Sequence, residues 1–377
     1  MRSSVSAFRV RSVTVIAAVI AIVSVFPPLP ANAATFSAQL VRGGLEFPAG
    51  FTVAPDGRFF YGERNNGQVR IFNPATSSDT LFFQVPNFLP ASGNERGLLG
   101  IALHPQYPSR RLVYIYTTRM INGAARAQIL RVTDSGGTGT NMQVQFNTVA
   151  ANHHNGGRIL FGPDGMLYLV NGDKQQAPLA QDTSNVAGKM LRMTPFGGVP
   201  SSNPFGNLVW AYGIRNSFGF DFDPQTGGLW ESDNGPECND ELNKIPKGGN
   251  MGWGPSQFCG DPPRAWMTNQ DGPNIVFPKR IYNGPPEIPA LTGLAFCSAC
   301  GLGAASDGTL FLGDFNQGMV RRVVLNSTRS GVSSQAVVYD HERPVLSMET
   351  GPNGAIYFSD IDFGSGLGGI YKLVFTP

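Results

Sequence analysis

The sequence contains few charged residues for its length. Asp, Glu, Lys and Arg make up 14% of the 377 residues, against about 25% in an average soluble domain. Lys and Arg occur singly rather than in clusters, and the formal net charge is only +2. A nucleic-acid-binding surface is therefore disfavoured. No long window has helical periodicity, whereas 47 Gly and 29 Pro are typical of many strands joined by many turns.

Long apolar runs are also scarce, and the only one lies near the N-terminus. Arg2, Arg9 and Arg11 precede the apolar stretch Val13–Phe26, which is short for a membrane span, and Ala31-Asn32-Ala33 fits a cleavage site. We expect residues 1–33 to be an export signal, with a retained anchor as the alternative. The rest of the chain is then secreted or periplasmic, without a membrane span.

Only four cysteines are present. Cys238 and Cys259 flank one loop region, and Cys297 and Cys300 form a CxxC motif. In an exported chain we expect two local disulfides, Cys238–Cys259 and Cys297–Cys300. A redox couple or half of a zinc site is the alternative for the CxxC, although the sequence has no second CxxC and no His nearby.

A two-part pattern recurs six times along the chain. Its first part is a turn followed by a short apolar and aromatic run, such as RFFYGE after Asp56-Gly57. Its second part places a cation beside apolar residues, as in Leu130-Arg131-Val132. Successive cations are 61, 61, 52, 78 and 50 residues apart: Arg70, Arg131, Arg192, Lys244, Arg322 and Lys372. This spacing predicts one supersecondary unit repeated six times.

Each repeat is typical of short β-strands, because its runs are rich in Phe, Tyr, Leu and Val and are too short for helices. Six such units predict an all-β fold, a six-bladed β-propeller formed by residues 34–377 as one domain. An array of β-sandwiches is the alternative, but it does not explain one repeat length over the whole chain. The Pro-rich stretch 252–289 is predicted to be an insertion in the fifth repeat.

Most of the aromatic runs end in a carboxylate. If these runs are the innermost strands of the blades, their ends gather around one mouth of the central channel. The alternative is that Asp and Glu are only turn residues at strand ends. The carboxylates are Glu63, Asp173, Asp233, Asp314 and Asp360.

Two segments contain more polar residues than a propeller needs. In residues 153–173, a His precedes Asn-Gly-Gly, where the backbone can approach a ligand closely. Asp173 ends the same repeat's run and could orient His154 as a general base. An exposed loop His is the alternative.

In residues 234–243, NGPECNDELN places Asp240 and Glu241 near Gly235-Pro236. This turn is rich in oxygen atoms, which are the ligands that calcium prefers. The alternative is a hydrated acidic loop without a metal.

Four strings in order resemble the soluble quinoprotein glucose/sorbosone (aldose sugar) dehydrogenase family. They are GLLGIALHP at 97–105, HNGGRILFGPDG at 154–165, GKMLRMTPFGGVPSSNPF at 188–205 and NGPECNDELNKIPKGGNMGW at 234–253. The resemblance spans about residues 45–373. It implies a six-bladed propeller that uses pyrroloquinoline quinone (PQQ) and calcium to oxidise a sugar hydroxyl, with an unknown electron acceptor.

The resemblance also implies roles for individual residues. His154 corresponds to the catalytic base, Asp173 to the residue that orients it, and Arg215 and Asn216 to a pair beside the quinone. Arg215 would stabilise negative charge on the reduced quinone. Main-chain carbonyls at Gly235 and Pro236 would hold calcium at the cofactor. Glu241 and the carbonyl of Met251 correspond to ligands of a second, structural calcium.

Several positions depart from the family's pattern. The cations that bind the quinone carboxylates fall on Asn316 in the fifth repeat and on Pro344 and Leu346 in the sixth. Arg343 is one residue out of register, and Glu95 stands where a Gln is expected. Arg343, Arg96 and Lys174 are candidate replacement cations. These departures keep a second hypothesis open, a calcium-stabilised propeller that binds carbohydrate or a protein without redox chemistry.

Overall fold

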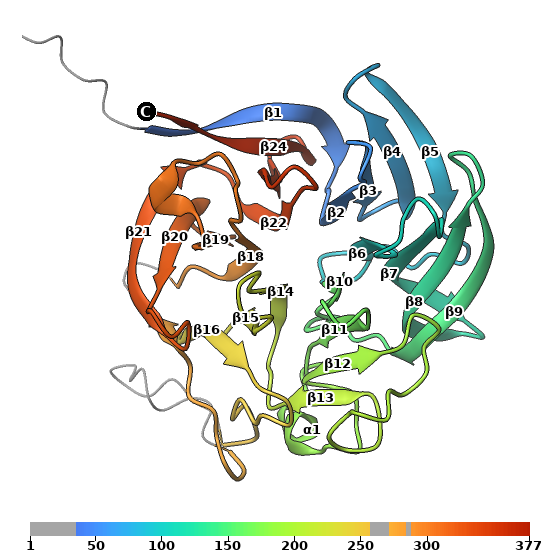
Figure 1. The fold of residues 1–377 in the computed structure, drawn as a ribbon. Coiled ribbons are helices and arrows are strands. Elements are labelled where there is room, and N and C mark those ends of the chain that lie inside the picture. The colour runs from blue at the N-terminus through green and yellow to red at the C-terminus, as the bar shows by residue number, and fades with distance from the viewer. Residues whose placement is uncertain (1–34, 257–270, 284–287) are drawn as a thin grey trace, which may run out of the picture. The chain divides into compact units, whose positions relative to one another are not determined.

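The structure, a computed structural model, describes residues 35–256, 271–283 and 288–377. Within these residues, 24 strands form six four-stranded antiparallel sheets. The sheets follow one another around a central axis as the blades of a ring (Figure 1). The prediction of an all-β, six-bladed β-propeller is therefore confirmed. Residues Ala34–Pro377 form one compact unit.

Each blade consists of four strands that are consecutive in sequence, except in the sixth blade. Blade one contains β2 (Gly50–Val53), β3 (Phe59–Glu63), β4 (Gln68–Asn73) and β5 (Ser78–Gln84). Blade two contains β6 (Leu98–Leu103), β7 (Leu112–Ile121), β8 (Ala124–Asp134) and β9 (Gly139–Val149). Blade three contains β10 (Ile159–Phe161), β11 (Leu167–Asn171), β12 (Lys189–Met193) and β13 (Val209–Tyr212).

The second half of the ring follows the same order. Blade four contains β14 (Ser217–Phe222), β15 (Leu229–Asp233), β16 (Asp240–Ile245) and β17 (Arg280–Tyr282). Blade five contains β18 (Leu291–Phe296), β19 (Leu310–Asp314), β20 (Met319–Leu325) and β21 (Val332–Asp340). Blade six contains β22 (Val345–Thr350), β23 (Ile356–Asp360), β24 (Leu367–Thr376) and β1 (Thr35–Glu46). One short helix, α1 (Ala177–Gln181), and a 3-10 turn, Ala304–Ser306, interrupt the described loops.

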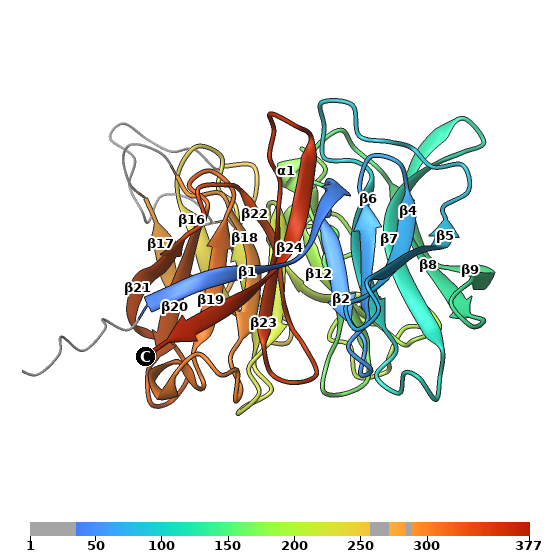
Figure 2. The same cartoon turned by 90° about the horizontal axis from the view of Figure 1, so that it is seen from above.

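Strand β1 closes the ring. It pairs with β24 from Thr35↔Thr376 to Glu46↔Leu367, so the two ends of the described chain lie in one sheet (Figure 2). The pairing covers the outer edge of β24, which would otherwise expose unpaired backbone groups. The sixth repeat is therefore completed by residues that precede the first.

The aromatic runs are the second strands of the blades, which corrects the expectation that they are innermost. Each sheet starts with β2, β6, β10, β14, β18 or β22, and these strands contact one another around the axis. Glycine allows this close approach. A Cβ atom at Gly219 of β14 would lie 1.9 Å from the carbonyl oxygen of Thr292 in the next blade. The carboxylates at the ends of the runs thus lie behind the innermost strands.

Six hydrophobic clusters fill the spaces between neighbouring blades. Val69 of blade one packs with Ile115 of blade two, for example, and Phe311 of blade five with Phe358 of blade six. Every blade buries both faces in this way, so no single repeat could form a core alone. Trp230, the largest fully buried side chain of the described residues, lies in the cluster between blades four and five.

The other expectations have different outcomes. Cys297 and Cys300 form the expected disulfide. Cys238 is also disulfide-bonded, but its expected partner Cys259 and the export signal at 1–33 lie outside the described residues. The only strand in the described residues of the Pro-rich stretch, β17, belongs to blade four rather than to the fifth blade, because it pairs with β16. No helix of the described residues is long and apolar enough to cross a membrane.

Candidate active site

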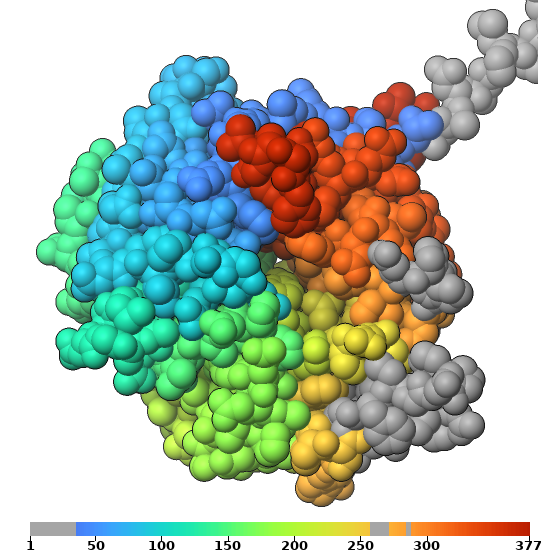
Figure 3. Space-filling view, turned by 180° about the vertical axis from the view of Figure 1, so that it is seen from behind, coloured from blue at the N-terminus to red at the C-terminus, as the bar shows by residue number. Residues whose placement is uncertain are grey.

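A cavity of about 810 Å³ opens at one mouth of the propeller. It lies where the innermost strands begin, and the space-filling view shows a hollow where the blades converge (Figure 3). Loops from several blades supply its walls. His154, Arg215, Asn216, Gly235, Pro236 and Asp240 all line it, so most of the residues expected at a catalytic site come together here.

His154 lies in a fixed orientation at the cavity wall. Its Nδ1 is 2.6 Å from Oδ1 of Asp173, and the other carboxylate oxygen, Oδ2, accepts a hydrogen bond of 2.7 Å from Nε1 of Trp253. Asp173 and Trp253 are buried. His154 itself has a left-handed φ of 57°, a conformation that costs energy in a non-glycine residue and often occurs at functional sites.

Trp253 was not identified from the sequence as a site residue, although it ends the last of the four family strings. It lies 80 residues after Asp173 in the chain, so only the folded structure brings the two together. The guanidinium of Arg215 also lies over the Trp253 ring, 5.3 Å from its centroid. Trp253 therefore contacts both Asp173 and Arg215.

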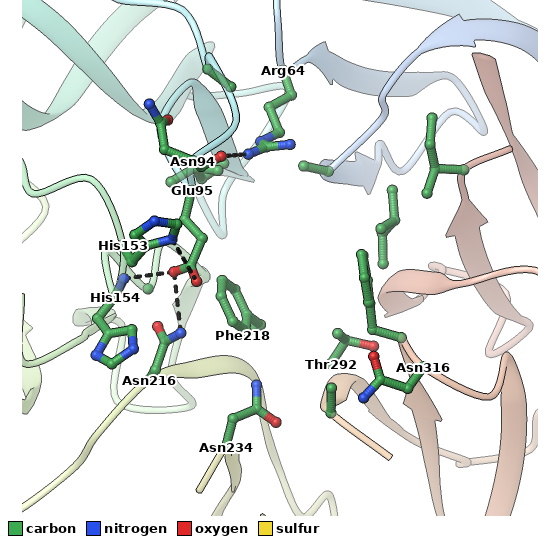
Figure 4. A pocket seen from close by; sticks show the side chains of 18 of the residues that line it. Arg64, Asn94, Glu95, His153, His154, Asn216, Phe218, Asn234, Thr292 and Asn316 are labelled. Atoms are coloured by element: carbon green, nitrogen blue, oxygen red, sulfur yellow. Dashed lines mark hydrogen bonds and ion pairs between the residues drawn. The ribbon is translucent and has the colours of Figure 1, made fainter. Parts of the chain in front are cut away.

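Glu95 contacts His153, His154 and Asn216 (Figure 4). Its Oε2 accepts hydrogen bonds from the backbone N–H of His154 at 2.6 Å and from Nδ2 of Asn216 at 3.1 Å. Its Oε1 lies 3.7 Å from Nδ1 of His153. The carboxylate that replaces the expected Gln thus accepts two hydrogen bonds, which stabilise its negative charge beside the cavity.

Arg215 and Asn216 are positioned through their backbone. Both carboxylate oxygens of Asp233 accept hydrogen bonds, from Arg215 N at 2.8 Å and from Asn216 N at 2.7 Å. Burial lowers the pKa of the Arg215 guanidinium, while Asp233 and Asp173 act in the opposite direction. Its Nη1 donates to the carbonyl of Asn234 at 2.9 Å, and no carboxylate of the described residues forms an ion pair with it.

The acidic loop after β15 supplies oxygen atoms to the cavity. Asn234, Gly235, Pro236 and Asp240 line it together. Gly235 N donates to Oδ1 of Asp240 at 3.0 Å, and a Cβ at Gly235 would lie only 1.7 Å from the carbonyl oxygen of Cys238. The turn can be built only with glycine at position 235, because a Cβ there would collide with this carbonyl oxygen. Burial raises the pKa of the Asp240 carboxyl to about 6, although backbone hydrogen bonds act in the opposite direction.

Glu241 and Met251 do not line this cavity. Glu241 follows Asp240 on β16, and successive side chains of a strand point to opposite faces. Its Oε2 accepts a hydrogen bond of 3.2 Å from Asn243. Met251 is fully buried, and its N–H donates to the carbonyl of Tyr212 at 2.8 Å. Any calcium at these two residues would be separate from the one expected at Gly235.

The opposite wall has uncharged residues where cations are expected. Asn316 lines the cavity, but its Nδ2 donates to the carbonyl of Ile288 at 2.8 Å. Leu346 also lines it, with Ile361 beside it. Arg343 does not line the cavity, and its guanidinium lies 3.6 Å from Asp360 and 3.8 Å from Asp362. Among the suggested replacements, Arg96 and Lys174 do not line the cavity either.

Two arginines that the sequence analysis did not single out line the cavity instead. Arg158 forms a buried ion pair with Glu349 and donates to the carbonyl of Met348 at 3.1 Å. Arg64 donates to the carbonyls of Asn94 and Arg96, and burial lowers its pKa. Within the described residues, Arg64 has no ion pair with a carboxylate. The cavity thus contains two half-buried guanidinium groups, Arg64 and Arg215, that form no ion pair with a carboxylate of the described residues.

Lys174 supports the turn that carries His154. Its N–H donates to the carbonyl of His154 at 3.3 Å, and its Nζ donates to both oxygen atoms of Asn155, at 3.2 and 3.3 Å. Burial lowers the pKa of Lys174 to about 7, although Asp173 and Glu95 act in the opposite direction. Burial also lowers the pKa of Lys189 to about 7.

These two lysines should make stability rise with pH above neutrality. The pKa of Lys174 is about 7 in the folded chain and near 10.4 in the unfolded chain. Between these two pH values the unfolded chain binds a proton at this lysine and the folded chain does not. The free energy of unfolding therefore rises with pH in this window and falls as pH is lowered. We expect Lys174→Met to reduce the slope of unfolding free energy by about 1.4 kcal/mol per pH unit between pH 8 and 9. Urea unfolding at several pH values measures the slope. Lys247→Met, at an exposed lysine, should leave it unchanged, and an unchanged slope in Lys174→Met would contradict the assignment.

Comparison with known proteins places the chain in a family. A family model described as Glucose / Sorbosone dehydrogenase matches residues 45–366. The chain therefore belongs to the glucose/sorbosone dehydrogenase family, as the four sequence strings predicted.

Individual relatives cover different parts of the chain. Aldose sugar dehydrogenase YliI of Escherichia coli (strain K12) is 26% identical over 344 residues, 86% of this chain and 90% of that protein. The PQQ-bound form of aldose sugar dehydrogenase from Streptomyces coelicolor has a TM-score of 0.75 at 27% identity and covers 92% of this chain and 100% of that one. Human Hedgehog-interacting protein is 31% identical over 217 residues, 48% of this chain and 31% of that protein.

Proposed function

We propose that this chain is an exported quinoprotein that oxidises a sugar hydroxyl, of the aldose-to-lactone type, with PQQ as cofactor and calcium assistance. The observation that carries the proposal is the pair formed by His154 and the buried Asp173, with Nδ1 and Oδ1 2.6 Å apart. The pair lies at the wall of a cavity that also holds two guanidinium groups without an ion pair among the described residues. Membership of a family with a PQQ-bound member supports it.

The residues of the cavity fit a carboxylate-bearing cofactor. Arg64 and Arg215 are half-buried and form no ion pair within the described residues, so their positive charge favours an anionic ligand, although Asp233, Asp173 and Glu95 offset part of it. Oδ1 of Asn216 is buried and lacks a hydrogen-bond partner, so it could accept a hydrogen bond from an N–H or O–H group of a ligand rather than from a carboxylate. Arg215, Asn216 and Arg64 would hold PQQ here, in place of the cations that are absent from the fifth and sixth blades.

The loop after β15 fits calcium. Oδ1 of Asn234 is buried without a partner, and the Asp240 carboxylate lies in the same cavity. Oxygen ligands of this kind suit Ca²⁺. Within the described residues, no three His, Cys, Asp or Glu side chains form a metal-binding cluster, so the calcium that we propose depends on the carbonyls of Gly235 and Pro236 together with Asp240. Glu241 and the Met251 carbonyl are proposed for a second calcium.

The chain's own residues would perform the proton transfer. Asp173 engages Nδ1 of His154, which leaves Nε2 as the atom that can take a proton from the substrate hydroxyl. The hydrogen bond from Trp253 keeps the carboxylate in place, and Glu95 fixes the backbone of His154. Arg215 supplies positive charge at the wall where negative charge would develop. When bound, PQQ would accept a hydride and Ca²⁺ would act as a Lewis acid.

Reconstitution of the purified protein tests the proposed function. The chain without residues 1–33 is incubated with PQQ and CaCl₂, and reduction of an electron-accepting dye is followed with a panel of aldoses. We expect turnover that requires both additions. Lack of turnover with every aldose, together with no PQQ binding, would refute the proposal. N-terminal sequencing of the exported protein would test cleavage after Ala33.

Trp253→Phe should lower kcat because it removes the donor to Asp173 and keeps most of the ring. A hydrogen bond to a charged group contributes about 1.5–3 kcal/mol, so we expect a loss of about tenfold or more. The KM for the sugar should change less than twofold, since Trp253 does not line the cavity. Trp210→Phe, which alters a tryptophan packed on Tyr168, should leave kcat unchanged. Equal kcat in both variants would contradict a positioning role.

The alternative function is a calcium-stabilised propeller that binds carbohydrate or a protein partner without redox chemistry. The uncharged wall at Asn316, Leu346 and Ile361 favours it, because these residues provide no cation for the quinone carboxylates. The partial similarity to Hedgehog-interacting protein, whose name describes a binding function, also favours it. Sugar binding in the reconstituted protein without dye reduction would select this alternative.

A further inference from the structure

A second cavity, of about 420 Å³, lies at the opposite mouth of the propeller. The innermost strands (Figure 1) end there, whereas the cavity of the candidate active site lies where they begin. Strand residues at its wall include Val53 of β2, Leu103 of β6, Phe161 of β10 and Phe222 of β14. Among the described residues, none lines both cavities, so the second cavity is a separate site.

His104 supplies a hydrogen-bond donor at the second cavity. The backbone N–H of Gln106 donates to Nδ1 of His104 at 3.1 Å, and burial lowers the pKa of the imidazole. The ring is therefore neutral at pH 7, with its proton on Nε2. His104 is 6% exposed and lines the cavity, yet no group of the described residues accepts a hydrogen bond from Nε2. A buried donor without an acceptor costs free energy, so this N–H favours a ligand that supplies an acceptor.

Asp221 supplies acceptors at the same cavity. Its Oδ1 accepts a hydrogen bond of 2.7 Å from the backbone N–H of Phe222, and its Oδ2 accepts one of 2.8 Å from that of Phe296. A carboxylate has about four lone-pair sites, so Asp221 can still accept hydrogen bonds from a ligand. Burial raises the pKa of Asp221 to about 7, and the nearby charge of Glu349 acts in the same direction. At neutral pH, Asp221 therefore carries only part of a negative charge.

Glu349 also lines the second cavity, and its charge is balanced. It forms an ion pair with Arg158, which lines the candidate active site instead. Its Oε1 accepts a hydrogen bond of 3.2 Å from Oγ1 of Thr52. The ion pair thus lies between the two cavities. Because Arg158 balances Glu349 and Asp221 is only partly ionised, the second cavity is polar but close to neutral.

Aromatic rings line the cavity beside these polar groups. They are Tyr107, Phe161 and Phe222, and the centroid of the Phe161 ring lies 5.6 Å from that of His104. Apolar walls with a few polar groups are typical of small-molecule sites, which measure about 300–1,000 Å³. An ammonium ligand cannot accept a hydrogen bond from His104, and an anionic ligand would lie beside two carboxylates. A hydroxyl both donates and accepts, so a neutral polyol with an apolar C–H face matches the cavity.

We propose that the second cavity is a binding site for a neutral sugar or related polyol. Nε2 of His104 donates to one ligand hydroxyl, and the carboxylates of Asp221 and Glu349 accept from others. A sugar held there is not oxidised, because His154 lies at the other cavity. The proposal does not depend on the proposed dehydrogenase function, since it concerns a different set of residues.

Binding of methyl α-D-glucopyranoside tests the second site, because this glycoside has no hemiacetal hydroxyl and cannot be oxidised to a lactone. Saturation-transfer NMR measures its dissociation constant for the exported chain, with and without PQQ and Ca²⁺. We expect the same Kd in both states. His104→Asn keeps an oxygen that can accept the Gln106 N–H but removes the Nε2 donor, and Asp221→Asn replaces one acceptor oxygen with an amide NH₂. Each variant should raise Kd about tenfold.

Asp56→Asn is the matched control for Asp221→Asn, because Asp56 is exposed and lines neither cavity. It should leave Kd unchanged. Thermal unfolding followed by circular dichroism checks that each variant is folded, and His104→Asn and Asp221→Asn provide two independent tests. Equal Kd values in the wild type and the folded site variants would overturn the proposal.

Three other results would also overturn the sugar site. Loss of glycoside binding on PQQ loading would assign the sugar to the candidate active site. Binding of putrescine that weakens in Asp221→Asn, without binding of the glycoside, would assign the second cavity to an organic cation. No binding of either probe at millimolar concentration would mean that the cavity holds only water.

Dehydrogenase assays separate this proposal from the proposed function. His104→Asn should leave kcat and KM for the aldose unchanged, since His104 does not line the candidate active site. If the wild-type protein oxidises no aldose but binds the glycoside as expected, the dehydrogenase function fails and the second site stands. If it oxidises aldose and the site variants bind the glycoside as the wild type does, the second site fails.

Discussion

Replacing His154 with glutamine should lower kcat for sugar oxidation by about a thousandfold. A positioned general base contributes about 10²–10⁴-fold to a rate, and His154 is held at 2.6 Å by Asp173. Glutamine keeps a polar side chain of similar size but cannot accept the proton. Steady-state rates with saturating aldose and dye measure the change, and PQQ binding by fluorescence titration checks that the cofactor site is intact.

His153→Gln provides the comparison, because the two histidines are adjacent in the sequence. His153 lies 3.7 Å from Glu95 and its side chain is 42% exposed, so it lacks a buried carboxylate that would orient it as a base. We expect a loss of less than about tenfold. A larger loss in His153→Gln than in His154→Gln would contradict the assignment of the base.

Removing either partner of the ion pair between Arg158 and Glu349 should destabilise the fold strongly. The two side chains are 7% and 9% exposed, and Oγ1 of Thr52 also lies 3.2 Å from Oε1 of Glu349. Loss of one partner leaves an uncompensated buried charge, which costs about 3–5 kcal/mol. We expect this decrease in the free energy of unfolding for Arg158→Met and for Glu349→Leu, measured by urea denaturation at pH 7.

The double variant Arg158→Met/Glu349→Leu separates the charge effect from a packing effect. It removes both charges together, and apolar replacement of a buried pair is often neutral or stabilising. We therefore expect it to lie within about 1 kcal/mol of the wild type. A double variant whose loss equals the sum of the two single losses would contradict this account.

The repeat pattern predicted the number of blades but not which strand lies innermost. The aromatic runs are the most regular part of each repeat, because second strands are covered on both sides. The innermost strands are less regular in sequence, since glycine is required where they converge. At Gly100 a Cβ atom would lie 2.1 Å from the carbonyl oxygen of Gly157. A single glycine among apolar residues does not distinguish such a strand from any other.

The site was predictable to the extent that it depends on local motifs. The family resemblance identified His154, Asp173, Arg215 and the loop at Gly235, and the fold brings them together. Trp253 and Arg64 were missed because their roles depend on contacts made by residues far apart in the chain. Arg343 was suggested from its position in sequence, but its side chain lies beside Asp360 and Asp362 instead.

The most direct measurement is the absorbance spectrum of the bound quinone during a single turnover. The protein is loaded with one equivalent of PQQ and with Ca²⁺, made anaerobic, and mixed with the best aldose in the absence of dye. Our account predicts rapid conversion to the reduced spectrum with one quinone per chain, and little conversion in His154→Gln. A spectrum that stays oxidised with every aldose, or an equally fast conversion in His154→Gln, would contradict it.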